Sequence, residues 1–501
     1  RAARFVPSVD DRDAGFVRQV SIFNNQVWIG DHGETTNALT INSKKSGEGQ
    51  IMKGKIKTLS VLLGLLLVLA VVLPACGTNQ GAGGGNAGQN GQGAAPNETG
   101  GSADKTQLLI YDYGQVGQPD SEIYNSLVQK FNARDDVRSV LNYQYVPGDS
   151  YYLKLNAVFA ANEPPDLFSA HAAGKLKPYV DADKVLPLNE FLDADPEWKA
   201  RFKEGVFDSV TFDGKIYGIP TQMNATALFY NQQIFDQYGL KPPGTYEELK
   251  HAVKVLRDNN VTPIAFGAKN PWAVALVAEI ITNRIGGNEP YDRVFEGTGT
   301  WEDPAFIRTG EILQELVAMK AFSEGFLGLS YDEFVAQFMN GQAAMLIMGS
   351  WVMGTIGGDS SPIKDVVHVA PFPVFEGGIG DPNTWLGQPD RSLVISKEAK
   401  NKEDLIEFIK MWSTDEVQAE IAERTGNLTV TKAQLDPGKV LPLGVELAKL
   451  MESMSQMVIF YDVGLGAKIG DEYNNTIVSI LAGESPAEAF AKLQKYTEEN
   501  R

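Results

Sequence analysis

Apolar residues along the chain follow two periods, and from about residue 105 onward these periods alternate. The stretch LLIYDY, which begins at Leu108, is almost continuously apolar, and Ile123, Leu127 and Phe131 then recur at helical spacing. A second strand and a second helix follow before a short apolar strand at Leu167. Strand, helix, strand, helix and strand in this order predict an α/β fold with a mostly parallel sheet and helices on its faces.

The loops that follow these strands are the first place to expect a ligand. In sheets of this kind, ligands bind outside the carboxyl ends of the strands. The loops Asp112–Gln118 and Ser169–Gly174 occupy those positions. We therefore expect the binding residues of this part of the chain in these two loops.

The chain after about residue 214 shows further helices and strands with clear end signals. Thr245 and Glu248 have the spacing of a capping box and precede a helical apolar stripe. The stretch YDEFVAQFMNGQAAMLIMGSW predicts a helix, a glycine stop, a buried strand and an exposed turn that carries Trp351. Ser485 and Glu488 predict a second capping box at the start of a C-terminal amphipathic helix.

One segment before the folded pattern has the layout of a targeting signal. Three lysines between Lys53 and Lys57 precede the apolar run Leu59–Val72, which is followed by Leu-Pro-Ala and then Cys76. This resembles the signal peptide of bacterial lipoproteins, which would span residues 52–75. The resemblance implies that a diacylglyceryl group is attached to the thiol of Cys76 and that cleavage leaves this cysteine first. An uncleaved transmembrane anchor is the alternative, because about 17 apolar residues can just cross a bilayer.

The segments on either side of this signal lack the pattern of a folded domain. A signal peptide acts from a chain terminus, so we interpret Met52 as the native start and residues 1–51 as non-native upstream translation. Residues 76–104 are rich in Gly, Asn and Gln without periodic apolar positions, which predicts a flexible linker. The predicted mature protein is a folded body tethered by lipid to the outer face of the cell membrane.

Composition narrows the class of protein further. The 501 residues are 43% hydrophobic, which suits two folded units or one two-lobed unit. Cys76 is the one cysteine, so an intrachain disulfide is impossible. The formal net charge of −19 argues against nucleic acid as a partner, because binding to phosphates requires a basic surface.

Several stretches between about Lys105 and Arg501 resemble the extracellular solute-binding proteins of bacterial ABC importers for sugars, of the family 1 type. They are DGKIYGIPTQMNATALFYNQQIFDQYGL, TYEELKHAVKVL, FMNGQAAMLIMGSW, VHVAPFPVF, DRSLVISKEAKNKEDLIEFIKMW and ILAGESPAEAFAKL, in the order typical of the family. The resemblance implies a two-lobed periplasmic-binding-protein fold of type II, with a hinge and a ligand cleft between the lobes. It also implies that a captured carbohydrate passes to ABC transporter permease subunits, from a protein that we expect to be a monomer.

The resemblance further implies that the chain passes between the lobes more than once. We expect residues 105–220 and 371–426 to form the first lobe, and residues 221–370 and 427–501 to form the second. The expected crossings lie near Gly218–Thr221, Pro371–Phe375 and Gly426–Val430.

The chemistry of a sugar selects the residue types of its site. A sugar carries hydroxyl groups around its edge and C–H faces above and below, so it needs fork-shaped hydrogen-bonding side chains and flat aromatic rings. Lobes that close on the ligand exclude water from these bonds and strengthen them. By position in the matched stretches and loops, we expect these ligand-binding residues: Tyr113, Gln115, His171, Asn224, Trp272, Trp351, Trp385, Asp390, Tyr461 and Asp462.

Two features of these candidates bear on the ligand. Trp385 lies in a polar stretch with Gly and Pro, which predicts an exposed loop position and not a core position. In the best-known sugar binders of the family, the loop that corresponds to Ser169–Gly174 carries an aromatic residue and an acid. This chain has serine and alanines there, which leaves the identity of the sugar open.

Other classes of function stay open at this point. A surface-anchored hydrolase acting on carbohydrates would need two carboxylates across a cleft, and acidic residues are abundant. A binding protein that presents its ligand to a membrane sensor would carry similar residues, and a polyol is an alternative ligand. The chain has no motif typical of metalloproteases, serine hydrolases, nucleotide sites or dinucleotide sites, so we expect no enzyme activity, cofactor or metal.

Overall fold

The structure is a computed structural model that describes residues 19–23, 26–30, 105–114 and 119–501. Several predictions concern other residues. The signal peptide, Cys76, the linker and Gln115 all lie outside the described residues.

The chain divides into two compact units, residues 1–98 and residues 99–501. In the first unit, β1 (Gln19–Phe23) pairs in antiparallel fashion with β2 (Gln26–Gly30). The second unit contains every other described helix and strand.

One sheet of the second unit matches the predicted alternation of strands and helices. Its strand order is β13-β5-β3-β4. β3 (Thr106–Tyr113) runs parallel to β4 (Ser139–Val146) and β5 (Leu167–Ala170), whereas β13 (Ser392–Ile395) is antiparallel to β5. The prediction of a mostly parallel sheet is therefore confirmed, and we call this sheet with its helices the first lobe.

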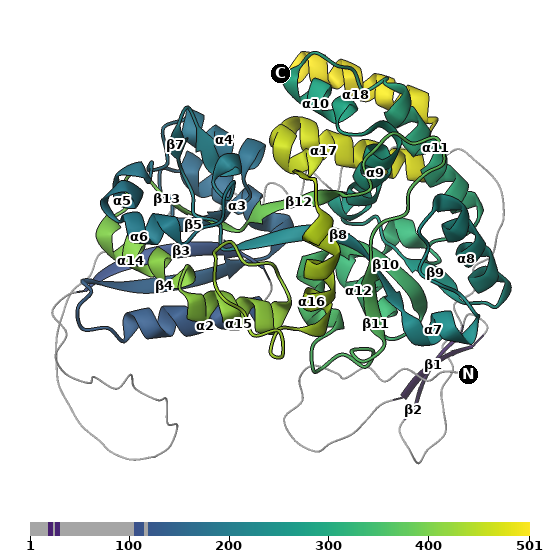
Figure 1. The fold of residues 1–501 in the computed structure, drawn as a ribbon, viewed down its shortest axis with the longest axis horizontal. Helices are drawn as coiled ribbons and strands as arrows, with labels where there is room; N and C mark the ends of the chain where they lie inside the picture. Colours follow the sequence, from purple (N-terminus) through teal and green to yellow (C-terminus); the bar gives the residue numbers. More distant parts are fainter. Residues whose placement is uncertain (1–18, 24–25, 31–104, 115–118) are drawn as a thin grey trace, which may run out of the picture. The chain divides into compact units, whose positions relative to one another are not determined.

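Helices cover both faces of the first-lobe sheet, with α2 (Pro119–Asn132) and α15 (Asp415–Thr425) on one face and α3 (Gly148–Ala160) and α4 (Ala173–Asp181) on the other (Figure 1). α2 buries Ile123, Leu127 and Phe131, the stripe predicted from their spacing. Each such side chain contributes about 1.5–3 kcal/mol relative to leaving it exposed. The other elements of this lobe are α5 (Asn189–Ala194), α6 (Pro196–Ala200), η1 (Asp208–Val210), β6 (Thr211–Phe212), β7 (Lys215–Ile216) and α14 (Lys402–Trp412).

The second sheet has the order β14-β12-β8-β10-β9, with β11 also paired to β8. β8 (Gln222–Asn231) is antiparallel to β10 (Ala343–Gly349) and to β12 (Thr384–Asp390). We call this sheet with its helices the second lobe. Its remaining strands are β9 (Thr262–Ala265), β11 (Val367–Ala370) and β14 (Gln456–Val458).

Helices also surround the second sheet, and each lobe has a hydrophobic core of its own. The long α9 is buried along most of its length because other helices pack around it. The helical elements of this lobe are α7 (Gln232–Gln237), α8 (Tyr246–Asp258), α9 (Pro271–Gly286), α10 (Glu289–Glu296), α11 (Pro304–Ala318), η2 (Phe326–Gly328), α12 (Tyr331–Met339), η3 (Ser350–Val352), α13 (Met353–Ile356), α16 (Pro442–Leu450), η4 (Met451–Ser453), α17 (Tyr461–Leu481) and α18 (Pro486–Asn500).

The first passage between the lobes lies in the stretch where we expected it. Ile219 pairs with Leu393 of the first lobe, and β8 of the second lobe begins three residues later at Gln222. The second passage differs from the prediction at Pro371–Phe375. It consists of Arg391 alone, because β12 ends at Asp390 in the second sheet and β13 begins directly afterwards in the first.

The reason for this correction is strand pairing over long distance. β12 hydrogen-bonds to β8 on one side and to β14 on the other, so its backbone groups are satisfied within the second sheet. Residues 371–390 therefore lie with the second lobe and not with the first. The third passage is longer than the predicted Gly426–Val430, since Thr431 still pairs with Phe202 of the first lobe and Leu441 is the next residue in the second core.

The predicted helix ends are partly confirmed. Thr245 and Glu248 form the expected capping box, and Gly341 with φ of 67° follows α12. Ser485 precedes α18 but its side chain makes no capping hydrogen bond, so the second predicted box is wrong. The same motif does form at Ser330 and Glu333, where it fixes the start of α12.

Among the helices of the described residues, none combines the length and the apolar character needed to cross a membrane.

Candidate functional site

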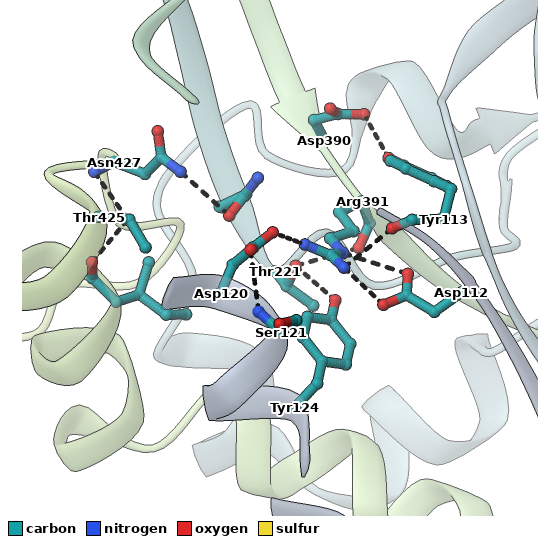
Figure 2. Close-up of polar contacts among 12 residues, drawn as sticks. Asp112, Tyr113, Asp120, Ser121, Tyr124, Thr221, Asp390, Arg391, Thr425 and Asn427 are labelled. Atoms are coloured by element: carbon teal, nitrogen blue, oxygen red, sulfur yellow. Dashed lines mark hydrogen bonds and ion pairs between the residues drawn. The ribbon is translucent and has the colours of Figure 1, made fainter. Parts of the chain in front are cut away.

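Arg391 is the centre of a buried charge cluster at the junction of the lobes (Figure 2). Its Nε and Nη2 atoms donate to Asp112 at 3.1 and 2.5 Å, and its Nη1 atom forms an ion pair with Asp120. Its Nη2 atom also donates to the backbone oxygen of Tyr113 at 2.9 Å. Arg391 is 3% exposed and Asp112 is fully buried, so each charge depends on the other for compensation.

The cluster also explains the backbone of the one-residue passage. Arg391 has φ of 53°, in the left-handed region that non-glycine residues seldom adopt. The hydroxyl of Thr221 donates to its carbonyl oxygen at 3.1 Å, and its guanidinium lies over the ring of Tyr124 at 4.2 Å. Burial lowers the pKa of Arg391, but the charges of Asp112 and Asp120 outweigh burial and raise it. Arg391 is therefore a fixed cation that holds the passage in place.

Asp390 joins three other predicted site residues in one polar cluster. Its Oδ1 atom accepts from the Tyr113 hydroxyl at 3.2 Å and lies 2.7 Å from Nδ1 of His171. Its Oδ2 atom accepts from the side-chain amide of Asn224 at 3.0 Å. Burial opposes ionisation of Asp390, but the charge of His171 and the hydrogen bonds together lower its pKa. Four residues predicted from separate parts of the chain thus meet around one carboxylate.

Two buried amides next to this carboxylate have acceptor atoms to which no described residue donates. Asn224 on β8 lies directly opposite Gln388 on β12. The residues are 1% and 2% exposed, and Oδ1 of Asn224 and Oε1 of Gln388 have no hydrogen-bond partner in the part of the chain that the structure describes. A buried acceptor without a donor is costly, so these two atoms indicate a ligand that brings donors.

An aromatic group from the second lobe lies at the same junction. The rings of Trp272 and Trp351 are 6.0 Å apart, Tyr331 lies 5.4 Å from Trp272, and Phe460 lies 5.9 Å from Trp351. Trp272, Tyr331 and Trp351 are only partly buried. These separations suit rings that pack edge to face and leave a face for a ligand.

Local structure positions Trp351 in this group. A Cβ atom on Gly349 would lie 2.0–2.4 Å from the Trp351 ring, so only glycine leaves room for the ring there. The neighbouring Ser350 hydroxyl donates to Oδ1 of Asn427 at 3.2 Å and accepts from the backbone of Ala225. The turn that carries Trp351 is thereby tied to the third passage and to β8.

Several contacts bring the two lobes close at this junction. After burial and Asp332, the charge of Asp120 in α2 also raises the pKa of Tyr331 across the junction. On another side, Nζ of Lys175 in α4 donates to Asp471 of α17 at 2.6 Å. Beside that pair, a Cβ on Gly174 would lie 2.4 Å from the backbone of both Gly464 and Gly466, so α4 and α17 approach at glycines.

The structure does not bring two predicted residues into the site. Trp385 is 4% exposed and lies in β12 within the second core, so the predicted exposed loop is wrong. Tyr461 is 1% exposed and stacks on Tyr291 at 3.9 Å, also within that core. The next residue, Asp462, is half-buried. Burial is the main cause that raises the pKa of Tyr152 in the first lobe, and the charge of Asp462 adds to it. Asp462 therefore lies at the junction while Tyr461 does not.

Residues that the sequence prediction missed hold the site together. Asp112 is the one acid in an otherwise apolar strand, and this exception to the pattern is a signal that was available. Gln388 and Arg391 lie next to the predicted Asp390, but their roles depend on strand pairing that spacing does not show. Tyr331 stands at the first position of α12, where it reads as an ordinary helix start.

A pocket elsewhere in the second lobe is a weaker candidate. It has a volume of about 820 Å³ and lies between α8, α11 and the loop that contains Phe375. Its lysine is already paired, because Nζ of Lys250 lies 2.6 Å from Glu247 and 3.4 Å from Glu315. None of the buried polar atoms without a partner in the described residues belongs to its lining.

The chemistry of the junction favours binding. In the described part of the chain, no group of three His, Cys, Asp or Glu side chains could hold a metal ion. The junction combines carboxylate and amide acceptors with flat rings, which suits a neutral ligand with many hydroxyl groups.

Comparison with known proteins gives one family. The model of the family described as "Bacterial extracellular solute-binding protein" matches residues 117–419. An uncharacterized ABC transporter extracellular-binding protein of Pyrococcus horikoshii is 28% identical over 299 residues, which cover 58% of this chain and 65% of that protein. The melibiose/raffinose/stachyose-binding protein of Bacillus subtilis is 22% identical over 346 residues, which cover 67% and 78% respectively.

Solved structures agree with this family. A chitin oligosaccharide binding protein has a TM-score of 0.74 and 28% identity, and the match covers 79% of this chain and 99% of that one. A structure from work on xylan utilization by the thermophilic bacterium Caldanaerobius polysaccharolyticus also has a TM-score of 0.74, with 29% identity over 78% of this chain and 99% of that one.

Proposed function

Because the chain belongs to the family of bacterial extracellular solute-binding proteins, we propose that it captures an oligosaccharide between its lobes and delivers it to an ABC transporter. The observation that carries this proposal is the pair of unpartnered acceptors on Asn224 and Gln388 beside Asp390, at the junction that also holds Trp272 and Trp351. Relatives named for melibiose, raffinose and stachyose and for arabinooligosaccharides support a carbohydrate as the ligand.

The two halves of the site would bind different parts of a sugar. Hydroxyl groups at the edge of a sugar ring can donate to the free acceptors of Asn224 and Gln388. The C–H faces can lie on Trp272 or Trp351, which offer flat apolar area. A ligand that contacts both lobes stabilises the arrangement in which they lie together.

A thermal-shift screen with mono- and oligosaccharides tests the proposal. A saccharide that binds only the folded protein raises the melting temperature of the protein. The increase grows with the ratio of the saccharide concentration to its Kd. The Trp351→Ala variant should lose this shift, and Phe295→Ala should keep it, because Phe295 is 53% exposed on α10. If amino acids or metal ions shift the melting temperature and no saccharide does, the proposal is wrong.

We also propose that the protein is not an enzyme. The aspartates of the junction are engaged, with Asp112 and Asp120 bound to Arg391 and Asp390 bound to His171 and Asn224. The fourth, Asp462, accepts from the side-chain amide of Asn474. Hydrolysis of a glycosidic bond needs a free acid and a second carboxylate on opposite sides of that bond. Chromatography after incubation should recover every bound oligosaccharide uncut, and shorter products would contradict this reading.

The place of action is the outer face of the cell membrane. The family is extracellular, and the segment that ends at Cys76 supports a lipid anchor, although that residue lies outside the described part of the chain. We propose that the protein acts as a monomer. The Cys76→Ser variant should be released from the membrane fraction into the medium. Retention of the variant in that fraction would count against the lipid anchor and leave the binding function untouched.

A further inference from the structure

Four aspartates lie around the junction of the lobes. Asp112, Asp120 and Asp390 belong to the two clusters that meet at the Arg391 passage. Asp462 approaches from α17, where it accepts from the side-chain amide of Asn474 at 3.1 Å. A ligand at this junction therefore lies near carboxylates, of which Asp112 and Asp390 are buried.

The cations near these carboxylates are already engaged by the protein. Arg391 directs its guanidinium at Asp112, Asp120 and a backbone carbonyl, and it is 3% exposed. His171 directs Nδ1 at Asp390. Lys175 donates to Asp471 at 2.6 Å.

Even with His171 protonated, Arg391 and His171 are two positive charges against four carboxylates. Lys269, three residues before Trp272 in the sequence, is exposed to solvent. Together with hydrogen bonds from Ser330, which have the larger effect, its charge lowers the pKa of Glu333 in α12. Among the described residues, the balance of charge at the junction is therefore negative.

An independent observation points the same way. Oδ1 of Asn224 and Oε1 of Gln388 are buried acceptors for which no described residue supplies a donor. Hydroxyl and ammonium groups can donate to them, whereas carboxylate and phosphate oxygens only accept. Both the charge and the hydrogen-bonding capacity of the junction thus disfavour an anionic group.

We propose that the site selects neutral or amino-bearing saccharides and rejects saccharides that carry a carboxylate or a phosphate. The inference rests on the proposed function and deepens it, because it names the chemical class of saccharide. A like charge brought close to the junction is repelled, and this repulsion grows as water is excluded between the lobes.

Matched ligands test this selection. The probes are raffinose, cellotriose and chitotriose, each with a counterpart in which the C6 alcohol of a terminal sugar is oxidised to a carboxylate. Isothermal titration calorimetry at low salt should show that the affinity of each carboxylate counterpart is at least about tenfold lower than that of its neutral parent. The amine obtained by deacetylating chitotriose should bind without this loss.

A variant links the selection to a residue. Asp462→Asn keeps the size of the side chain and removes one charge. The ratio of the affinity for a neutral parent to the affinity for its carboxylate counterpart should therefore decrease by about threefold. Asp236→Asn is the matched control, because Asp236 lies on α7 and accepts from Gln232 on the same helix. That control removes the same charge away from the junction and should leave the ratio unchanged.

The outcomes separate the inference from the function beneath it. Equal affinity of a neutral parent and its carboxylate counterpart would overturn the charge selection and keep the sugar-binding function. A preference that persists in full in Asp462→Asn would overturn the role of Asp462. If none of the saccharides binds while another class of solute does, the proposed function falls and the inference falls with it.

Discussion

The two halves of the site are built by different physics. On the side of the first lobe and the passages, charges and hydrogen bonds hold every side chain, as around Arg391 and Asp390. On the side of the second lobe, Trp272 and Trp351 are positioned by ring contacts and by the space above Gly349. A network of buried charges tolerates little change, because each member compensates another. An aromatic surface offers contact area to many ligands.

This difference assigns a role to each half. Directional bonds at the polar half recognise the chemical identity of a ligand, whereas the aromatic half supplies area that grows with ligand length. Changes in the polar half should therefore affect folding as well as binding. Changes in the aromatic half should affect binding above all.

Removal of the central cation breaks the polar half and should have the largest effect. Arg391→Met leaves the fully buried Asp112 without its counter-charge, and we expect a loss of about 3–5 kcal/mol in the free energy of unfolding. Urea unfolding followed by circular dichroism measures this loss. Arg134→Met is the control, because Arg134 pairs with Asp136 at the surface and should cost about 1 kcal/mol or less.

Removal of a ring tests the aromatic half. Trp351→Ala should weaken oligosaccharide binding by about 10- to 100-fold, as for a large aromatic anchor, while unfolding changes less than in Arg391→Met. Titration with a monosaccharide and with the matching trisaccharide should show the greater loss for the trisaccharide. An equal loss for both would contradict the assignment of ligand length to this half.

The glycine contact between α4 and α17 sharpens the comparison, because it touches neither half directly. Gly174→Ala places a methyl group against the backbone of Gly464 and Gly466, so the lobes should meet less closely. We expect saccharide affinity to fall about tenfold, with a larger radius of gyration in small-angle scattering of the complex. Gly148→Ala is the control, since no atom lies within 4 Å of its Cβ position.

The smallest expected effect concerns pH. The pKa of Asp390 is lowered from its usual value of 3.8 in the folded protein, so this group stabilises the fold above about pH 4 and loses that contribution as pH falls further. The free energy of unfolding of the native protein should therefore fall more steeply below pH 4 than that of Asp390→Asn. Parallel curves for the two proteins would show that Asp390 does not contribute in this way.

The sequence predicts the local features of this fold well. The strands of the first lobe and the stripe on α2 are set by residues within one element, and the capping box at Thr245 involves residues three apart. Trp385 shows where such reasoning stops, because β12 becomes a core strand only by pairing with β8 and β14. No pattern within residues 384–390 contains that information.

The same limit applies to the site. Tyr113, His171, Asn224 and Asp390 could be chosen from their loops and matched stretches, and the structure brings them together. The pairing of Asp112 with Arg391 joins residues that are 279 positions apart. Its physical signal, an acid in an apolar strand, indicates that a partner exists but not which residue it is.

The one-residue passage at Arg391 has a consequence for the order in which the protein matures during synthesis. The strand that completes the first sheet, β13, follows this residue, so the first sheet is unfinished until most of the second lobe has left the ribosome. Until then Asp112 has no counter-ion and is better solvated than buried. The first lobe therefore completes its sheet and its buried ion pair only after residues 391–395 have been made.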